Sequence, residues 1–229
     1  MQRKKNHLRA LKKTTMPDYV LEQAAIADGH TTIAGVDEVG RGPWAGPVVA
    51  GAAILDIGLL PDELLKALDD SKKLKPTRRF EIYEWMKAEA GILLGIGMAS
   101  VEEVDEINIL QASLRAMRRA VENLPNAPSY VLVDGNKPPK LDCPVQCVVK
   151  GDAKSLSIAA ASIAAKVTRD AIMEDLDQAF PGYGWNTNSG YGTKAHQDGL
   201  KRLGVTKHHR RSFKPVKAAL EASPDIESP

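Results

Sequence analysis

The chain has 229 residues, of which 43% are hydrophobic and 26% are charged, and its formal net charge is +2. This composition fits one globular domain, or a domain with extensions, that buries a sizeable core. The two cysteines, Cys143 and Cys147, exclude a disulfide framework and indicate a reducing, cytoplasmic environment. No apolar run is long enough to cross a membrane, and the basic N-terminus lacks the apolar segment of a secretory signal.

Lysines and arginines cluster at two places in this otherwise balanced chain. Residues 1–13 and 201–217 each hold several cations and no acid. Clustered cations favour a surface that binds a polyanion. The alternatives are a solvated tail for the first cluster and a solvated helix face for the second, where His208, His209 and Phe213 interleave with the cations.

The predicted elements begin after an extension over residues 1–30, which includes a short helix at 17–27. In chain order, the first half is expected to hold strands at 33–37 and 46–55, helices at 61–67 and 76–89, and a strand at 91–99. Pro76 is a typical first residue of a helix. The polar loop at 70–74 precedes it.

The second half of the chain is predicted to be richer in helix. It is expected to hold a helix at 107–123, strands at 129–134 and 145–150, a helix at 155–179, a Gly/Asn/Tyr loop at 181–192, and helices at 193–202 and 215–222. The alanine-rich segment 155–179 has no internal Gly or Pro, which favours a helix. This order of elements predicts an α/β core with a mixed sheet and a C-terminal helical part.

Acidic residues end several of the predicted apolar segments. Asp37 and Glu38 close the first strand, Asp134 closes the strand at 129–134, and Asp152 lies between a strand and a helix. Buried carboxylates are costly unless a cation or hydrogen bonds offset their desolvation. Ligands of α/β sheets bind outside the carboxyl ends of strands, and oxygen ligands suit magnesium or manganese. The acids therefore predict a site where two such ions could hydrolyse a phosphodiester.

Each of these acids also has a purely structural interpretation. Asp152 could cap the N-terminus of the helix that follows it, and Asp134 could be a turn residue in Asp-Gly-Asn. Neighbouring residues on a regular strand point to opposite faces of the sheet. A shared site for Asp37 and Glu38 therefore predicts a bend in the strand at this point.

Long motifs along the chain resemble those of bacterial ribonuclease HII. They are Gly35-Val-Asp-Glu-Val-Gly-Arg-Gly-Pro-Trp-Ala-Gly, Asp70-Ser-Lys-Lys-Leu, Val133-Asp-Gly-Asn, Lys150-Gly-Asp-Ala-Lys-Ser, Ile158-Ala-Ala-Ala-Ser-Ile-Ala-Ala-Lys, Gly190-Tyr-Gly-Thr-Lys-Ala-His and His208-His-Arg-Arg-Ser-Phe. The match spans about 33–217 in order. It implies a ribonuclease H-like fold, with a central mixed five-stranded sheet flanked by helices and a C-terminal helical extension.

The resemblance also implies a domain organisation and an activity. Residues 1–30 are a basic N-terminal extension, 31–222 the catalytic domain, and 223–229 a disordered tail. The implied enzyme is a monomeric cytoplasmic endonuclease that uses Mg²⁺ or Mn²⁺. It cuts the RNA strand of RNA–DNA hybrids and incises DNA duplexes at embedded ribonucleotides, leaving 3′-hydroxyl and 5′-phosphate ends. Its implied role is the removal of ribonucleotides and RNA primers during DNA replication and repair.

The family's functional residues have counterparts in this sequence. By resemblance, the catalytic metal ligands are Asp37, Glu38, Asp134 and Asp152. The motif that reads the ribose 2′-hydroxyl through backbone contacts is matched by Gly40, Arg41 and Gly42. Tyr191 matches the tyrosine that stacks on the sugar at the RNA–DNA junction. The proline that often follows this tyrosine is Gly192 here, which is expected to loosen the loop.

Further substrate contacts are predicted from spacing and position. Lys166 and Arg169 share a helix face and are expected to hold phosphates, unless they pair with Asp170 or Glu174. A second helix face, with a solvated role as its alternative, carries Asn108 and Gln111. Loop contacts to the DNA strand are expected from Ser71 and Lys72.

Histidines and cysteines are given structural roles. His196 and His209 are expected to pack or to lie at the surface, with proton transfer as the alternative. A metal site at Cys143 and Cys147 is disfavoured because no second Cys/His pair completes it.

Two other functions compete with the hybrid-specific nuclease. A non-catalytic nucleic-acid-binding module would lack one of the four acids, and none is missing. A phosphatase for small esters is disfavoured by the Gly-Arg-Gly turn, Tyr191 and the basic region, which favour a polymeric substrate.

Overall fold

The structure is a computed structural model that describes residues 16–68 and 74–222. The basic run at 1–13, the predicted contacts Ser71 and Lys72, and the tail at 223–229 lie outside the described residues.

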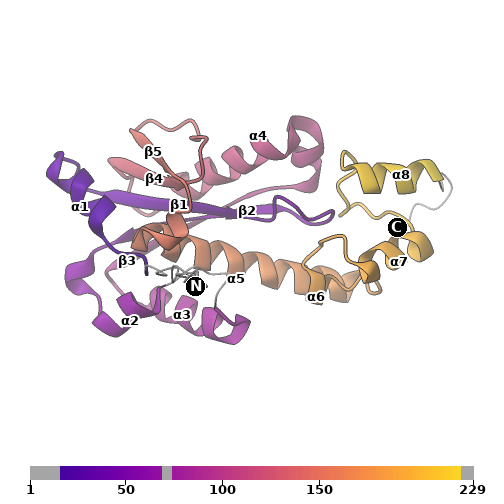
Figure 1. The fold of residues 1–229 in the computed structure, drawn as a ribbon, viewed down its shortest axis with the longest axis horizontal. Helices are drawn as coiled ribbons and strands as arrows, with labels where there is room; N and C mark the ends of the chain where they lie inside the picture. Colours follow the sequence, from indigo (N-terminus) through magenta and orange to yellow (C-terminus); the bar gives the residue numbers. More distant parts are fainter. Residues whose placement is uncertain (1–15, 69–73, 223–229) are drawn as a thin grey trace, which may run out of the picture.

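A mixed five-stranded sheet forms the centre of the molecule (Figure 1). Its strands are β1 (Ile33–Val39), β2 (Val48–Leu55), β3 (Ile92–Ala99), β4 (Tyr130–Asp134) and β5 (Val145–Val148). They lie in the order β3-β2-β1-β4-β5. The β1–β2 and β2–β3 pairs are antiparallel, whereas β1–β4 and β4–β5 are parallel. The predicted mixed sheet is confirmed, although β5 ends two residues before the predicted residue 150.

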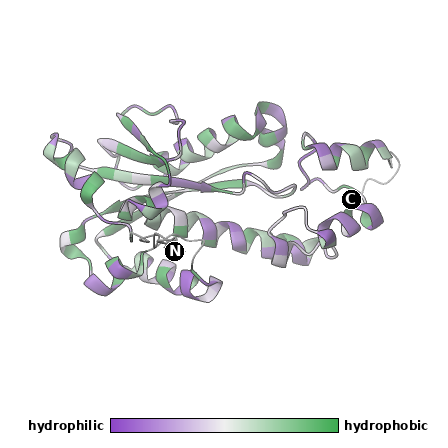
Figure 2. Ribbon diagram, viewed as in Figure 1, coloured by the Kyte–Doolittle hydropathy of each residue, from purple (hydrophilic) through white to green (hydrophobic). Residues whose placement is uncertain are grey.

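Two long helices cover the two faces of the sheet (Figure 1). One core cluster joins α4 (Val101–Glu122) to β1 and β2, and another joins α5 (Leu156–Ala179) to β2, α2 and α3. The strand glycines allow close packing. A Cβ added to Gly35 or Gly51 would lie 2.2 Å from the α5 backbone. Figure 2 shows apolar residues gathered on the strands and on the inward sides of these helices.

Shorter helices complete the chain. On the α5 side lie α2 (Asp62–Ala67) and α3 (Pro76–Ala88), while α1 (Val20–Ala27) precedes β1. Beyond the C-terminal end of α5, the C-terminal helical part contains α6 (Trp185–Asn188), α7 (Lys194–Leu203) and α8 (Lys214–Ala222) (Figure 1). This part has its own core around Tyr183 and Trp185. The loop between β1 and β2 reaches it, since Ala45 forms a β-bridge with His209.

Two predicted boundaries are wrong. The helix expected at 107–123 begins at Val101, because the Ser100 hydroxyl and the Glu103 side chain form a capping box. It is interrupted at Asn108, whose φ of 66° is non-helical and whose Oδ1 accepts hydrogen bonds from the N–H groups of Leu110 and Gln111. The loop expected at 181–192 contains the short helix α6.

In the part of the chain that the structure describes, no helix has the length and apolar character needed to span a membrane.

Candidate active site

The pair Asp37–Glu38 lies within β1 rather than at a bend. Asp37 is opposite Gly51 and Glu38 is opposite Ala50 in a regular antiparallel register. The predicted bend is therefore wrong, and the two side chains point to opposite faces of the sheet. Asp37 shares the face of Gly35, which packs against α5, and Glu38 shares the face of Val36, which packs in the α4 cluster. The site lies across the end of the sheet and draws on both faces.

Asp134 ends the neighbouring parallel strand. Val36 of β1 is opposite Val133 of β4, so the parallel register brings Asp134 beside Asp37. Its Oδ1 accepts a 2.6 Å hydrogen bond from the N–H of Gly151. This bond ties the end of β4 to the turn that leads into α5. Asp134 is therefore held by a tertiary contact rather than by the Asp-Gly-Asn turn alone.

Asp152 lies in that same turn, the 3₁₀ segment Gly151–Ala153, and is 5% exposed. The helix that follows is capped by Ser155, whose hydroxyl accepts a hydrogen bond from the N–H of Ile158. The alternative in which Asp152 is the N-cap is therefore wrong. The turn places Asp152 next to Gly151, the residue that binds Asp134.

Glu38 is the electrostatically strained member of the group. Its Oε1 accepts a 3.2 Å hydrogen bond from the Arg41 guanidinium, and its Oε2 is buried without a hydrogen-bond partner among the described residues. Burial raises the pKa of Glu38, Arg41 partly offsets that rise, and the charge of Asp134 adds to it. A carboxylate with an orphaned buried oxygen is suited to accept a cation.

The donor chemistry of the four acids fits a hard divalent cation, since all of their side-chain ligand atoms are oxygens. In the conformation described, no three His, Cys, Asp or Glu side chains of residues 16–68 and 74–222 gather around one point as metal ligands. Asp37 accepts a hydrogen bond from the Glu38 N–H, Glu38 from Arg41, and Asp134 from the Gly151 N–H.

The Gly-Arg-Gly turn and Tyr191 lie together, although they are far apart in the sequence. A Cβ added to Gly42 would lie 3.1 Å from the Tyr191 ring, and Tyr191 is 51% exposed. The Trp44 N–H donates to the Gly190 carbonyl, which joins the two loops. The structure therefore brings the predicted 2′-hydroxyl reader and the predicted stacking tyrosine to one surface beside Glu38 and Arg41.

The Trp44 indole packs against Gly192 in the loop after Tyr191. A Cβ at position 192 would lie 2.1 Å from the Trp44 indole, so the indole fills the space that a side chain would need. The Gly192 carbonyl also accepts a hydrogen bond from the Gln197 amide. The expectation of a looser loop stays a prediction.

The predicted phosphate contact by Arg169 is wrong in this structure. Arg169 is 1% exposed, and its guanidinium donates to the carbonyls of Pro47, Ser189 and Ala45. Burial lowers its pKa to about 10. Lys166 forms an ion pair with Asp170, which confirms the alternative interpretation for that residue.

The structure shows where the predicted phosphate contacts Asn108 and Gln111 lie. Asn108 and Gln111 are exposed at and just after the break in α4, and the side-chain Oδ1 of Asn108 caps the second part of the helix. Gln111 lines an outer groove with Arg115 and Lys140. Their binding to phosphate stays a prediction.

The two histidines of the C-terminal part are buried, which confirms the packing role. The His209 Nδ1 accepts from the Thr206 N–H, and the Nε2 atoms of His209 and His196 lie 3.0 Å apart. His196 in turn donates through Nδ1 to the Tyr191 carbonyl at 3.0 Å. The indole N–H of Trp185 also donates to the His196 Nε2. The pair holds the backbone at Tyr191.

Three residues near the site were missed by the sequence reasoning. Asn136 and Lys137 line a small cavity of about 40 Å³ together with Glu38, Arg41 and Asp134. Their position directly after the acid-terminated strand is the signal that could have found them. Arg210 is fully buried and bonds the Gly-Arg-Gly loop. In the sequence, Arg210 belongs to the basic cluster at 201–217, which predicted a surface role instead.

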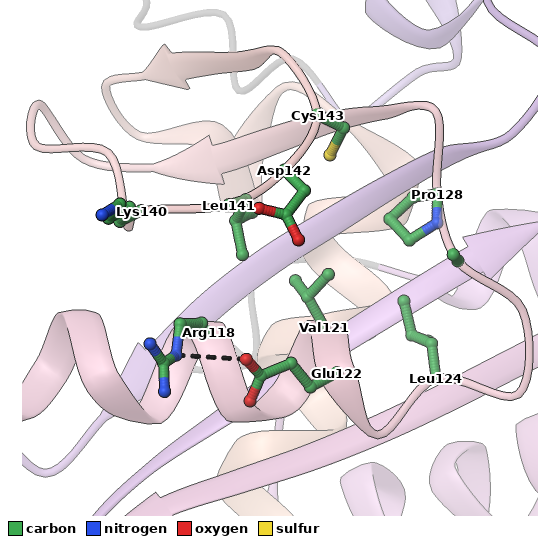
Figure 3. Close-up of a pocket in the computed structure, with 10 residues that line it drawn as sticks. Arg118, Val121, Glu122, Leu124, Pro128, Lys140, Leu141, Asp142 and Cys143 are labelled. Carbon is green, nitrogen blue, oxygen red and sulfur yellow. Dashed lines mark ion pairs between the residues drawn. The ribbon is translucent and has the colours of Figure 1, made fainter.

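A cavity of about 540 Å³ lies away from the four acids, between the end of α4 and the segment before β5 (Figure 3). It is lined by Arg118, Glu122, Leu141, Asp142 and Cys143, among others, and Arg118 pairs with Glu122 across one turn of helix. Cys143 and Cys147 are both free thiols.

Comparison with known proteins identifies the relatives of the chain. A family model described as Ribonuclease HII matches residues 34–216. A ribonuclease HII of Paramagnetospirillum magneticum is 59% identical over 201 residues, covering 88% of this chain and 97% of that protein. A ribonuclease HII of Ruegeria pomeroyi is 57% identical over 203 residues, covering 88% and 84% respectively.

A solved structure with a similar fold belongs to the same class of enzyme. The crystal structure of the ribonuclease H2 from Pyrococcus horikoshii superposes with a TM-score of 0.70 at 28% identity, covering 85% of this chain and 100% of that one. The match covers the four acids, the Gly-Arg-Gly turn and Tyr191, all of which lie within residues 34–216. The chain therefore belongs to the ribonuclease HII family of metal-dependent ribonuclease H endonucleases.

Proposed function

We propose that this endonuclease, whose family acts on RNA–DNA hybrids, also incises DNA duplexes 5′ to a single embedded ribonucleotide and leaves 3′-hydroxyl and 5′-phosphate ends. We assign it to ribonucleotide removal and RNA primer removal during replication and repair. One observation carries the proposal. The Gly42 backbone and the Tyr191 ring meet beside the Glu38–Arg41 pair, so recognition groups lie next to the acids.

The proposed contact of each residue with the substrate follows from its position. Arg41 and Gly42 present backbone at an exposed turn, where the absence of a side chain on Gly42 allows a ribose to approach. The 2′-hydroxyl is the local group that distinguishes RNA from DNA. The half-exposed Tyr191 ring offers a flat apolar face for the sugar that follows. The exposed Lys137 lies beside the acids, where it can meet a backbone phosphate.

Asp37, Glu38, Asp134 and Asp152 are the residues that would hold Mg²⁺ or Mn²⁺. A pair of such ions, when bound, supplies activation of the attacking water and stabilisation of the leaving oxygen. The protein's part is to hold four oxygen donors at one end of the sheet. The hydrogen bond from Gly151 to Asp134 sets the spacing between β4 and the turn that carries Asp152.

Asp134→Asn tests the assignment. The variant should lose cleavage of a DNA duplex carrying one ribonucleotide by about 100-fold or more, because the amide removes a charged ligand. Its affinity for the same duplex, measured in Ca²⁺ by fluorescence anisotropy, should change less than about threefold, since the proposed role of Asp134 is to hold a metal ion and not to bind the duplex. Exposed Asp142→Asn, at the distant cavity, is the matched control.

The substrate series decides the specificity. Wild-type protein is incubated with the single-ribonucleotide duplex, an RNA–DNA hybrid and an all-DNA duplex, each with Mg²⁺, Mn²⁺ or EDTA. Cleavage of the all-DNA duplex at the rate of the other two would contradict recognition of the 2′-hydroxyl. Activity in EDTA would contradict the metal assignment.

A further inference from the structure

A buried guanidinium lies beneath the Gly-Arg-Gly turn. Arg210 is completely buried and donates to the carbonyls of Gly40 at 2.6 Å, Pro43 at 2.8 Å and Arg41 at 3.2 Å. It also donates twice to the Gly46 carbonyl. No carboxylate of the described residues bonds this guanidinium. The hydrogen-bond acceptors of this cation are therefore backbone carbonyls, and the Phe213 ring lies 5.2 Å from its Cζ atom.

Binding the carbonyls fixes the direction of the amides that follow them. No peptide bond of the described residues is cis, and in a planar trans peptide the C=O of one residue points opposite to the N–H of the next. The Gly40 and Arg41 carbonyls point inward at Arg210. The N–H groups of Arg41 and Gly42 therefore point outward.

These two amides are available for a ligand. Arg41 and Gly42 are exposed, and neither N–H donates to an acceptor among the residues the structure describes. Further along the loop the amides are used internally. The Trp44 N–H donates to the Gly190 carbonyl and the Gly46 N–H to the His208 carbonyl. Of the peptides whose carbonyls Arg210 binds, those after Gly40 and Arg41 therefore keep an N–H with no acceptor among the described residues, whereas the one after Pro43 uses its N–H internally.

We propose that Arg210 is a positioning residue for ribonucleotide recognition, which holds the turn so that the Arg41 and Gly42 N–H groups face the ribose 2′-hydroxyl. The inference rests on the proposed function, and it adds the residue that orients the amides proposed to recognise the 2′-hydroxyl. Arginine suits the role because its planar guanidinium offers five donors in a fixed fork. A lysine at this position has three donors on one atom and cannot reach the same set of carbonyls.

Arg169 provides a control for a merely structural role. It is also buried, at 1% exposed, and donates to three backbone carbonyls, those of Ala45, Pro47 and Ser189, where Arg210 donates to four. The amides that follow these carbonyls lie inside the protein: the Gly46 N–H donates to the His208 carbonyl, the Gly190 N–H donates to the Asn188 Oδ1, and Val48 is buried opposite Ala99 of β3. Arg169→Lys should therefore disturb packing comparably without freeing or turning a donor that faces the substrate.

The test compares Arg210→Lys, Arg169→Lys and exposed Arg78→Lys in single-turnover cleavage of the single-ribonucleotide duplex. Arg210→Lys should lower the cleavage rate by about 10- to 100-fold, Arg169→Lys by less, and Arg78→Lys not at all. The affinity of each protein for Mn²⁺, measured by calorimetry, should stay within about twofold of wild type. Hydrogen–deuterium exchange at residues 40–47 should accelerate in Arg210→Lys without substrate.

Several results would overturn the inference. They are a folded Arg210→Lys that cuts like wild type, an equal loss in Arg169→Lys at equal thermal stability, or a parallel loss of Mn²⁺ affinity. If Arg210→Lys does not fold, the wild-type amide signals of Arg41 and Gly42 decide by NMR. They should shift on adding the ribonucleotide duplex in Ca²⁺ and not on adding the all-DNA duplex, and unchanged signals refute the inference. Wild-type protein that fails to cut the ribonucleotide duplex refutes the proposed function instead.

Discussion

Glu22→Gln should destabilise the protein, although Glu22 lies in α1, before the residues that the family model matches. Glu22 is completely buried against the start of α5. Its Oε1 accepts from the hydroxyls of Ser155 and Ser157 at 2.6 Å and from the Ser157 N–H at 3.0 Å. Its Oε2 has no partner among the described residues. The carboxylate therefore supports the N-terminus of the helix that follows the Asp152 turn.

The expected loss follows from three contributions. Hydrogen bonds to a charged group are worth about 1.5–3 kcal/mol and neutral ones about 0.5–1.5 kcal/mol, so three bonds weaken by roughly 3 kcal/mol together. The loss of a negative charge at a helix N-terminus adds about 0.3–1 kcal/mol. Relief from burying a charge offsets part of this, and the free energy of unfolding should fall by about 2–3 kcal/mol.

Urea unfolding of wild type and Glu22→Gln measures this difference. Glu174→Gln, an exposed substitution on α5, is the matched control and should change stability by less than about 0.5 kcal/mol. The reasoning is refuted if Glu22→Gln unfolds within about 0.5 kcal/mol of wild type. It is also refuted if the variant is more stable, because then the desolvation of the buried charge outweighs its three bonds.

Two further substitutions test the exposed Tyr191 and the buried His209. Tyr191→Ala should lower cleavage at a single ribonucleotide about tenfold more than it lowers affinity for an RNA–DNA hybrid, because the ring packs on Gly42 rather than in the core; equal losses would contradict a junction-reading role. Burial and the neighbouring His196 lower the pKa of His209 to about 3, below the value of about 6.5 in the unfolded chain. His209 stays neutral in the folded state while the unfolded state binds a proton, so stability is full above pH 6.5. It should fall by up to about 1.4 kcal/mol per pH unit as the pH drops toward 3. Thermal melts from pH 7 to 4.5 should therefore be less pH-dependent in His209→Gln than in wild type, and identical slopes would refute this assignment.

The strands could be predicted, and the four acids could be proposed as metal ligands, because their signals are local. Apolar runs of strand length ending in an acid need no tertiary information to be recognised. The start of α4 was harder, since Glu102 and Glu103 resemble a loop until Ser100 and Glu103 are recognised as a capping box. The break at Asn108 was hidden because its own side chain supplies the hydrogen bonds that restart the helix.

Arg169 and Arg210 show why the roles of other residues near the site could not be predicted without the three-dimensional structure. Arg169 and Arg210 have the same local signal as a phosphate-binding arginine, and sequence distance gives no hint of the carbonyls at 40–47 that surround them. A guanidinium satisfies several carbonyls at once, so it can be buried without an acid where a lysine could not. Whether an arginine binds the nucleic acid or the loop that reads it therefore depends on which backbone carbonyls the fold turns toward it. In this chain, Arg210 lies behind the turn and Arg41 in front of it.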